Sequence, residues 1–478
     1  MTRYISTRGH GTSKSKVEGT SPKSFEQVLL AGLAPDGGLY VPESWPVLER
    51  KSLERMAGIP YADVAMQVML PFIGDCINHA DFRRILAETY ESDVFDHASV
   101  TPLRQLSPNI WQMDHFHGPT LAFKDVALQL LGRLFDHVLQ KRGERVTIVG
   151  ATSGDTGSAA IEACRHCKNV DIFILHPKGR VSEVQRRQMT TVQADNVYNL
   201  AIEGTFDDCQ NMVKAMFGDA HFRADMNLSA INSINWARIM AQIVYYVTAS
   251  AALGGPEREV SFSVPTGNFG NIFAAYAARQ MGVPIRRLII STNRNDILTR
   301  FFESGEMKLD HVSPSYSPSM DIQISSNFER YLFDLMGRDP HALTAVMEDF
   351  KKNGKYKMDE AHMQKARAEF SAHRCDDEQT LSIMRQTYGE TGIVIDPHTA
   401  VGLHGALSTK DDPSVPIVNL ACAHPAKFPD AVEKAIGRRP ALPERMVDLL
   451  ERPEILTPLP NDLKKVQDYV QANSRVKS

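Results

Sequence analysis

Short apolar, β-branched runs alternate with helical patterns through the middle and late parts of the chain. These runs predict strands at residues 146–149, 171–175, 197–202, 260–264, 287–291 and 417–420. Helical stretches separate several of them, for example residues 272–281. Strands joined through helices form right-handed crossovers, so the pattern predicts an α/β fold with mostly parallel sheets.

The flanking regions have a different character. Residues 1–100 are predicted to be mostly helical, apart from a strand at residues 4–7 and a turn-rich segment, GLAPDGGLYVP. Residues 101–300 and 387–440 form the predicted α/β core, with a small subdomain at approximately 120–210. The charged segment 301–386 is predicted to be a helical insertion, and residues 441–478 a loosely packed tail. The apolar stretch 239–253 is too short and too polar for a membrane span, which indicates a buried helix.

Composition narrows the functional classes. The chain has 478 residues, which is too long for one compact core, and a net charge of −4. No basic field exists to hold nucleic acid or an acidic membrane surface, so small anions must be bound locally by loops. The N-terminus has no apolar run typical of a secretory signal, and we expect a cytoplasmic protein. Its basic, Ser/Thr-rich character is also compatible with a transit peptide, but we favour an opening strand.

The six cysteines are too sparse for a disulfide scaffold in a chain of this length. Cys164 and Cys167 form a single CxxC pair. A structural zinc site needs a second pair or histidines, so we favour two reduced helix cysteines and no metal, with a redox or metal role as the alternative.

Two glycine-rich loops each follow a predicted strand and precede a predicted helix. Glycine lets the backbone approach a ligand, and a helix N-terminus offers unpaired N–H groups to an anion. The first loop is suited to a phosphate, although an ordinary strand–helix turn is the alternative; it contains Gly267, Asn268, Phe269, Gly270 and Asn271. The second is GATSGDTGS, where hydroxyls and amides could bind a carboxylate or a phosphate; it contains Thr152, Ser153, Asp155 and Thr156.

The third chemical element is the lysine in HGPTLAFKD. Lys124 follows Leu-Ala-Phe at the start of an apolar helical pattern. Removal from water favours the neutral, nucleophilic amine that Schiff-base chemistry requires. The alternative is a lysine that extends to solvent and pairs with Asp125. A desolvated lysine, a phosphate cradle and a hydroxyl-rich anion loop together are the parts of a pyridoxal-phosphate enzyme that acts on an amino acid.

Seven motifs then become recognisable in order along residues 4 to about 430. They are YISTRG, GLAPDGGLYVP, HGPTLAFKD, ATSGDTGSAA, NSINWARIMAQ, VPTGNFGN and AHPAKF. On these motifs the chain resembles the threonine synthase family, of the longer bacterial and fungal kind. The resemblance implies a fold type II pyridoxal-phosphate architecture, similar to the tryptophan synthase β subunit, with two mostly parallel α/β domains.

The resemblance also implies roles for individual residues. Lys124 is expected to hold the cofactor and move protons, and residues 267–271 to hold the cofactor phosphate. Thr152, Ser153, Asp155 and Thr156 are expected to bind substrate. Asn232 and Arg238 are expected near the substrate phosphate, where an arginine fork binds well; a surface salt bridge is the alternative for Arg238.

One position departs from the family pattern. The residue before AHPAKF is typically a threonine whose hydroxyl faces the pyridine nitrogen of the cofactor, and here it is Cys422. A thiol is a weaker hydrogen-bonding group than a hydroxyl. We hypothesise that Cys422 takes the place of the threonine without disabling catalysis.

The implied reaction is conversion of O-phospho-L-homoserine and water to L-threonine and phosphate, a carbon–oxygen lyase activity of amino-acid biosynthesis. We expect a small-molecule substrate, no nucleic acid or membrane partner, and a monomer or homodimer. One alternative is another enzyme of the same fold, such as a serine/threonine dehydratase or a cystathionine synthase. Another is a non-catalytic relative that binds phosphorylated hydroxy amino acids or a partner protein.

Overall fold

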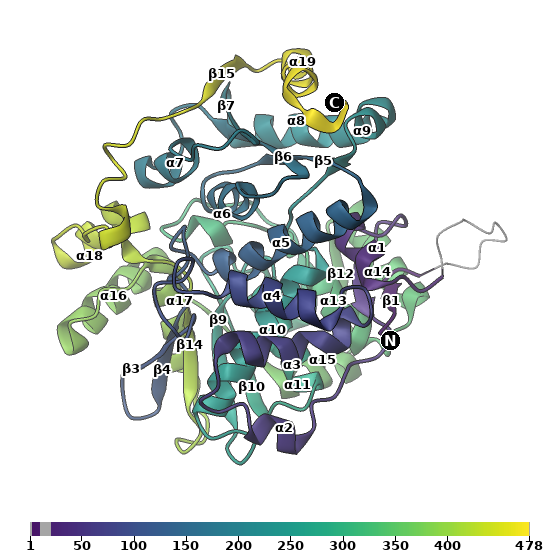
Figure 1. Cartoon of the computed structure of the whole chain (residues 1–478). Coiled ribbons are helices and arrows are strands. Elements are labelled where there is room, and N and C mark those ends of the chain that lie inside the picture. The colour runs from purple at the N-terminus through teal and green to yellow at the C-terminus, as the bar shows by residue number, and fades with distance from the viewer. Residues whose placement is uncertain (1, 10–20, 478) are drawn as a thin grey trace. The chain divides into compact units, whose positions relative to one another are not determined.

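The computed structural model describes residues 2–9 and 21–477 (Figure 1). Much of the basic N-terminal segment considered as a transit peptide lies outside the described residues. The chain divides into two compact units. Unit 1 comprises Met1–His117 and Ser233–Pro440, and unit 2 comprises Gly118–Asn232 and Ala441–Ser478.

Unit 1 is built on a six-stranded sheet of order β13-β10-β9-β14-β4-β3. Five strands are parallel and β3 pairs antiparallel to β4 at one edge. The carboxyl ends of the parallel strands therefore share one edge of the sheet, where ligands bind in this class of fold. The strands are β13 (Phe370–Arg374), β10 (Ile285–Thr292), β9 (Val260–Pro265), β14 (Ile417–Ala421), β4 (Ile110–Asp114) and β3 (Leu103–Gln105).

Helices surround this sheet, and two of them carry candidate site residues. Helix α10 (Trp236–Ala252) is almost wholly buried, which confirms the buried helix predicted from its apolar sequence, and it packs against α11 (Gly270–Gln280). No helix within the described part of the chain is long and apolar enough to cross a membrane. The other helices of unit 1 are α1 (Phe25–Ala31), α2 (Arg50–Glu54), α3 (Tyr61–Ile73), α4 (His79–Thr89), α12 (Ile297–Ser304), α13 (Phe328–Leu335), α14 (Pro340–Asn353), α15 (Glu360–Glu369), α16 (Asp377–Thr391), α17 (Pro397–Ser408) and α18 (Pro429–Ile436).

Small two-stranded pairs complete unit 1. β1 (Tyr4–Ser6), at the position predicted for the opening strand, pairs antiparallel with β2 (Tyr40–Pro42). β11 (Glu306–Lys308) pairs antiparallel with β12 (Lys355–Lys357). The segment predicted to be a helical insertion is thus mainly helical but not separate from the core, because its β13 pairs with β10 in the main sheet.

Unit 2 contains a five-stranded parallel sheet of order β15-β7-β6-β5-β8. Its strands are β15 (Thr457–Pro460), β7 (Val197–Glu203), β6 (Val170–Pro177), β5 (Val146–Ala151) and β8 (Leu228–Ser229). Its helices are α5 (Lys124–Arg142), α6 (Asp155–Cys164), α7 (Glu183–Thr190), α8 (Phe206–Gly218), α9 (Ala220–Asp225) and α19 (Leu463–Asn473).

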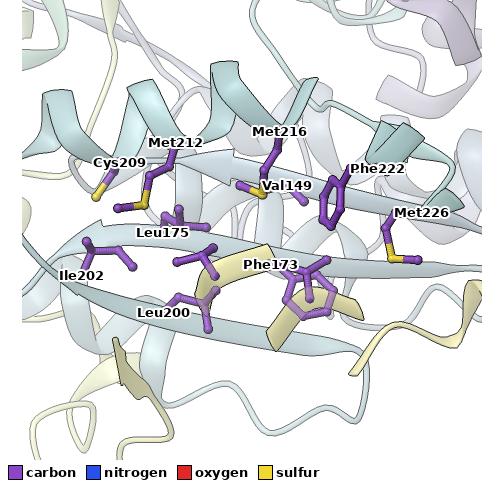
Figure 2. Packing of buried hydrophobic residues seen from close by; sticks show 12 residues of the cluster. Val149, Phe173, Leu175, Leu200, Ile202, Cys209, Met212, Met216, Phe222 and Met226 are labelled. Atoms are coloured by element: carbon purple, nitrogen blue, oxygen red, sulfur yellow. The ribbon is translucent and has the colours of Figure 1, made fainter. Parts of the chain in front are cut away.

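The core of unit 2 lies between its sheet and helix α8. Phe173 of β6 and Met212 and Met216 of α8 pack in one buried cluster (Figure 2). Val466 and Val470 of α19 belong to the same cluster and are fully buried. The expectation of a loosely packed tail is therefore wrong, because the tail adds both an edge strand and a core-facing helix.

The CxxC cysteines lie at the contact between α5 and α6. Both are buried free thiols, and the Cys167 thiol donates to the Gly132 carbonyl at 3.4 Å. A Cβ atom on Gly132 would lie 2.2 Å from the Ala163 carbonyl oxygen, so only glycine allows this approach of the two helices. The two cysteines therefore contribute to the packing of α6 against α5.

Candidate active site

Lys124 is the first residue of α5 and is only 7% exposed. Its Nζ lies 3.4 Å from Oδ2 of Asp155, which is also buried, and 5.4 Å from the centre of the Phe123 ring. The alternative of a lysine that extends to solvent is therefore wrong. A buried amine beside one carboxylate is placed to gain and lose a proton.

The loop before Lys124 is fixed by the neighbouring carboxylate. Asp125 is fully buried and accepts hydrogen bonds from the backbone N–H of Thr120 at 2.8 Å and from its hydroxyl at 2.7 Å. Gln188 of α7 donates to the Thr120 carbonyl at 3.0 Å. These bonds hold Leu121 in a left-handed conformation, with φ of 61°, three residues before the lysine.

The hydroxyl-rich loop joins β5 to α6, as predicted. The Thr152 hydroxyl oxygen accepts from the backbone N–H groups of Gly154 and Gly157, so this side chain shapes the loop. Ser153 is exposed and Thr156 half-buried, and the hydroxyls of both lack a hydrogen-bond partner among the described residues. Their hydroxyls and the first N–H groups of α6 are available to an anion.

Sequence reasoning missed Gln185, on α7. Its Nε2 donates to Oδ1 of Asp155 at 2.8 Å, and Ser182 donates to its Oε1 at 2.8 Å. Gly154 has φ of 148°, and a Cβ there would lie 2.6 Å from the Gln185 amide. Asp155 is thus held between Gln185 and Lys124 within unit 2. No motif marks this contact, because Asp155 is 30 residues away from Gln185 in sequence.

In unit 1, the predicted phosphate cradle joins β9 to α11. Phe269 occupies the N-cap position of α11 with φ of 60°, a conformation that costs of order 1–3 kcal/mol outside glycine. Its buried ring packs edge-on against Phe328 at 4.9 Å, which helps to hold it there. The loop therefore presents the N-terminus of an eleven-residue helix.

Asn271 provides a direct test of whether this loop fits a phosphate. The residue is 8% exposed, and its Nδ2 is buried with no hydrogen-bond partner among the described residues. A buried amide donor without an acceptor is costly unless a ligand satisfies it. The donors of this loop fit the oxygens of a phosphate group.

A second segment, which the sequence did not identify, forms hydrogen bonds to the cradle. Ser325 donates to the Gly267 carbonyl at 2.7 Å, and Ser326 donates to the Asn268 side-chain oxygen at 3.2 Å. The backbone N–H of Asn327 and its Nδ2 both donate to the Asn268 carbonyl at 3.0 Å. These residues lie within the region predicted to be an insertion, which therefore helps to form the site.

Arg238 lies on α10 and is only 5% exposed. Its guanidinium forms neither a hydrogen bond nor an ion pair with any residue that the structure describes. Burial lowers the pKa of Arg238 to about 10. The surface salt bridge considered as an alternative is absent from the described residues, and an unpaired buried cation favours an anionic ligand.

Cys422 directly follows β14 and is buried. Its Sγ lies 3.7 Å from the Leu420 carbonyl oxygen, and it is close enough to Tyr245 and Tyr246 to influence their pKa values. His115 packs edge-on against Tyr245 at 4.5 Å, and burial lowers the pKa of His115 to about 3. Cys422 and the cradle residue Asn271 are thus linked through the same two tyrosines.

Asn232 is the last residue of the first segment of unit 2, and Ser233 begins the second segment of unit 1. Its predicted contact with a substrate phosphate stays a prediction. Lys124 and the hydroxyl loop belong to unit 2, whereas the cradle, Arg238 and Cys422 belong to unit 1.

The parallel sheets, the buried lysine and the two anion loops define the class: this is a pyridoxal-phosphate-dependent enzyme of fold type II. Residues 94–350 match a family model described as pyridoxal-phosphate dependent enzyme. Residues 3–90 match one described as threonine synthase N terminus, and residues 399–470 one described as threonine synthase, C-terminal. The chain belongs to the threonine synthase family.

Individual relatives agree over the full length. The chain is 57% identical to a threonine synthase of Pseudomonas aeruginosa, covering 98% of each chain. A crystal structure of threonine synthase from Brucella melitensis with bound pyridoxal phosphate matches with a TM-score of 0.96 and 50% identity, covering 99% of this chain and 100% of the other. The yeast enzyme matches with a TM-score of 0.92 and 38% identity, covering 98% of each.

Proposed function

We propose that this enzyme converts O-phospho-L-homoserine and water into L-threonine and phosphate. The observation that carries the proposal is the buried Lys124 amine beside Asp155, in a chain 57% identical over nearly its whole length to a protein named threonine synthase. Conversion of this substrate requires proton movements at its carbon atoms and loss of phosphate. The described residues supply groups for both tasks.

Pyridoxal phosphate, when bound, supplies an electron sink that stabilises negative charge on the substrate carbon. Lys124 would hold the cofactor, and residues 267–271 would hold its phosphate. Once its amine is free, Lys124 Nζ removes and returns protons. Asp155, at 3.4 Å, stabilises the ammonium form that Nζ takes after each proton removal.

The remaining residues bind the two anionic groups of the substrate. Arg238 binds the phosphate, because its buried guanidinium has no carboxylate partner in the described structure. Asn232 assists at the same group. The hydroxyls of Ser153 and Thr156 and the N–H groups at the start of α6 bind the carboxylate, while Thr152 shapes that loop.

The test is a phosphate-release assay on phosphohomoserine, with threonine and serine as competing substrates. We expect turnover of phosphohomoserine, coupled one-to-one to threonine formation, and loss of turnover in Lys124→Ala. Faster deamination of threonine or serine would instead support a dehydratase. Cofactor binding without turnover of any of the three would support the non-catalytic alternative.

The assembly state and location stay predictions. We propose a monomer or homodimer, to be measured by sedimentation of the purified holoenzyme. We also propose a cytoplasmic protein, because all six cysteines are free thiols, as is usual in a reducing compartment.

A further inference from the structure

Two consecutive tyrosines of α10 converge on one oxygen atom of the cradle. The Tyr246 hydroxyl donates to Oδ1 of Asn271 at 2.7 Å and lies 3.1 Å from the Asn271 backbone oxygen. The Tyr245 hydroxyl donates to the same Oδ1 atom. All three side chains are buried, and the two tyrosines are fully so.

The two hydroxyls remain donors throughout the usable pH range. Burial raises the pKa of Tyr245 and of Tyr246 well above the ordinary value. A phenol that keeps its proton beside an amide oxygen satisfies that oxygen. Two such donors on Oδ1 therefore favour the orientation in which Oδ1 faces the tyrosines and Nδ2 faces away from them.

We propose that Tyr245 and Tyr246 are positioning residues that orient the Asn271 amide so that its Nδ2 donates to the cofactor phosphate. The inference rests on the proposed role of residues 267–271. With Oδ1 held by two hydroxyls, Nδ2 is the donor side of the amide, and it has no partner among the described residues. An unrestrained amide could turn its oxygen to the phosphate, where two acceptors would repel.

Loss of the tyrosine hydroxyls should therefore weaken binding of the cofactor phosphate and leave binding of the rest of the cofactor unchanged. Neither hydroxyl needs to touch the ligand. The expected signature is selective loss of affinity for a cofactor that carries a phosphate. A general loosening of the fold would weaken binding with and without the phosphate alike.

The experiment is a titration of apoenzyme with pyridoxal phosphate and, separately, with pyridoxal, followed by absorbance. The variants are Tyr245→Phe, Tyr246→Phe, the double variant and Asn271→Ala. Because a hydrogen bond to a charged group is involved, we expect the double variant to raise the Kd of pyridoxal phosphate about tenfold or more. Its Kd for pyridoxal should stay unchanged. Tyr61→Phe is the matched control, since the buried Tyr61 hydroxyl has no hydrogen-bond partner in the part of the chain that the structure describes.

Asn271→Ala separates failure of this inference from failure of the cradle assignment. If Asn271→Ala weakens pyridoxal phosphate selectively but the double tyrosine variant does not, the positioning role is wrong and the cradle stands. If Asn271→Ala has no phosphate-selective effect, the cradle assignment itself is wrong. Adding the tyrosine changes to Asn271→Ala should produce no further selective loss. An equal weakening of both ligands in the double variant would also overturn the proposal.

Discussion

The Nζ of Lys124 lies 3.4 Å from Oδ2 of Asp155, and both residues are 7% exposed. The pair is contained within unit 2, and Gln185 holds the second carboxylate oxygen at 2.8 Å. A carboxylate held at this distance stabilises a protonated amine by electrostatic attraction. In the proposed mechanism, Asp155 therefore acts on the residue that moves protons.

Asp155→Asn should slow the proton transfers of Lys124. The variant keeps the size of the side chain and one oxygen acceptor, which Gln185 can use, but removes the charge that stabilises the ammonium form. We expect kcat to fall about tenfold or more, within the range of acid–base effects. The kinetic isotope effect with substrate deuterated at the α-carbon should rise, because proton removal becomes more rate-limiting.

Asp171→Asn is the matched control for this prediction. Asp171 is a buried carboxylate of the same unit that pairs with Arg475 of the tail instead of with Lys124. Its loss should lower stability and leave the isotope effect unchanged. An unchanged isotope effect in Asp155→Asn would argue against the role assigned to Asp155.

Arg238→Met should lower activity and raise stability. The buried guanidinium, which has no partner among the described residues, has its pKa lowered to about 10 by burial, a shift that corresponds to a folding cost of about 3 kcal/mol at neutral pH. Its removal should raise the Tm measured by calorimetry, while kcat/KM for phosphohomoserine falls by about 100-fold, as expected for loss of a charged phosphate contact.

Arg330→Met is the comparison variant, and its Tm should change in the opposite direction. Arg330 is also fully buried, but it donates to the Tyr40 carbonyl at 2.9 Å and to Asn327 and the Ile234 carbonyl. Its loss leaves those acceptors unsatisfied and should lower Tm. A lower Tm for Arg238→Met as well would mean that Arg238 serves the fold instead of a ligand.

Cys422→Ser should retain activity within a few-fold, because a hydroxyl replaces the thiol as a small hydrogen-bonding group. Cys422→Ala removes that group and should lower kcat about tenfold, in line with loss of one hydrogen bond. Steady-state kinetics and the cofactor absorbance spectrum provide the measurement. An inactive serine variant would show that the thiol has a separate task.

His115 should make unit 1 sensitive to acid. Burial lowers its pKa to about 3, so the folded protein keeps it neutral while the unfolded chain binds a proton below about pH 6.5. The unfolded state then binds more protons between these values, and stability falls as pH falls through this window by up to about 1.4 kcal/mol per pH unit.

His115→Gln should reduce that acid sensitivity. Denaturation midpoints measured from pH 7 to pH 4.5 should fall less steeply in this variant than in the unchanged protein. The exposed His341→Gln is the control and should leave the slope unchanged. Equal slopes in all three proteins would exclude a contribution from His115.

The sequence predicts the central strands well, because buried parallel strands are short continuous β-branched runs. β5, β6, β7, β9, β10 and β14 all lie where such runs occur. Two of the strands that it missed have another character. β13 reads FSAHR and β15 reads TPLP, polar or proline-containing edge strands whose pairing depends on distant partners.

The same distinction applies to the site. Lys124 and the glycine loops could be singled out as candidates because each lies in a local motif that resembles the family pattern, and their roles stay predictions. The Gln185 contact to Asp155 and the tyrosine contacts to Asn271 could not, because folding brings together residues that no local pattern relates. The sequence also could not show that Arg238 is buried without a partner among the described residues, because an arginine on a helix usually forms a surface ion pair.

Borohydride reduction of the holoenzyme, followed by digestion and mass spectrometry, tests the central claim most directly. The account predicts that one lysine, Lys124, carries the reduced cofactor, and that Lys124→Ala carries none. Lys427 is a second buried lysine and the natural comparison. Cofactor attached to Lys427, or to no lysine at all, would contradict the account.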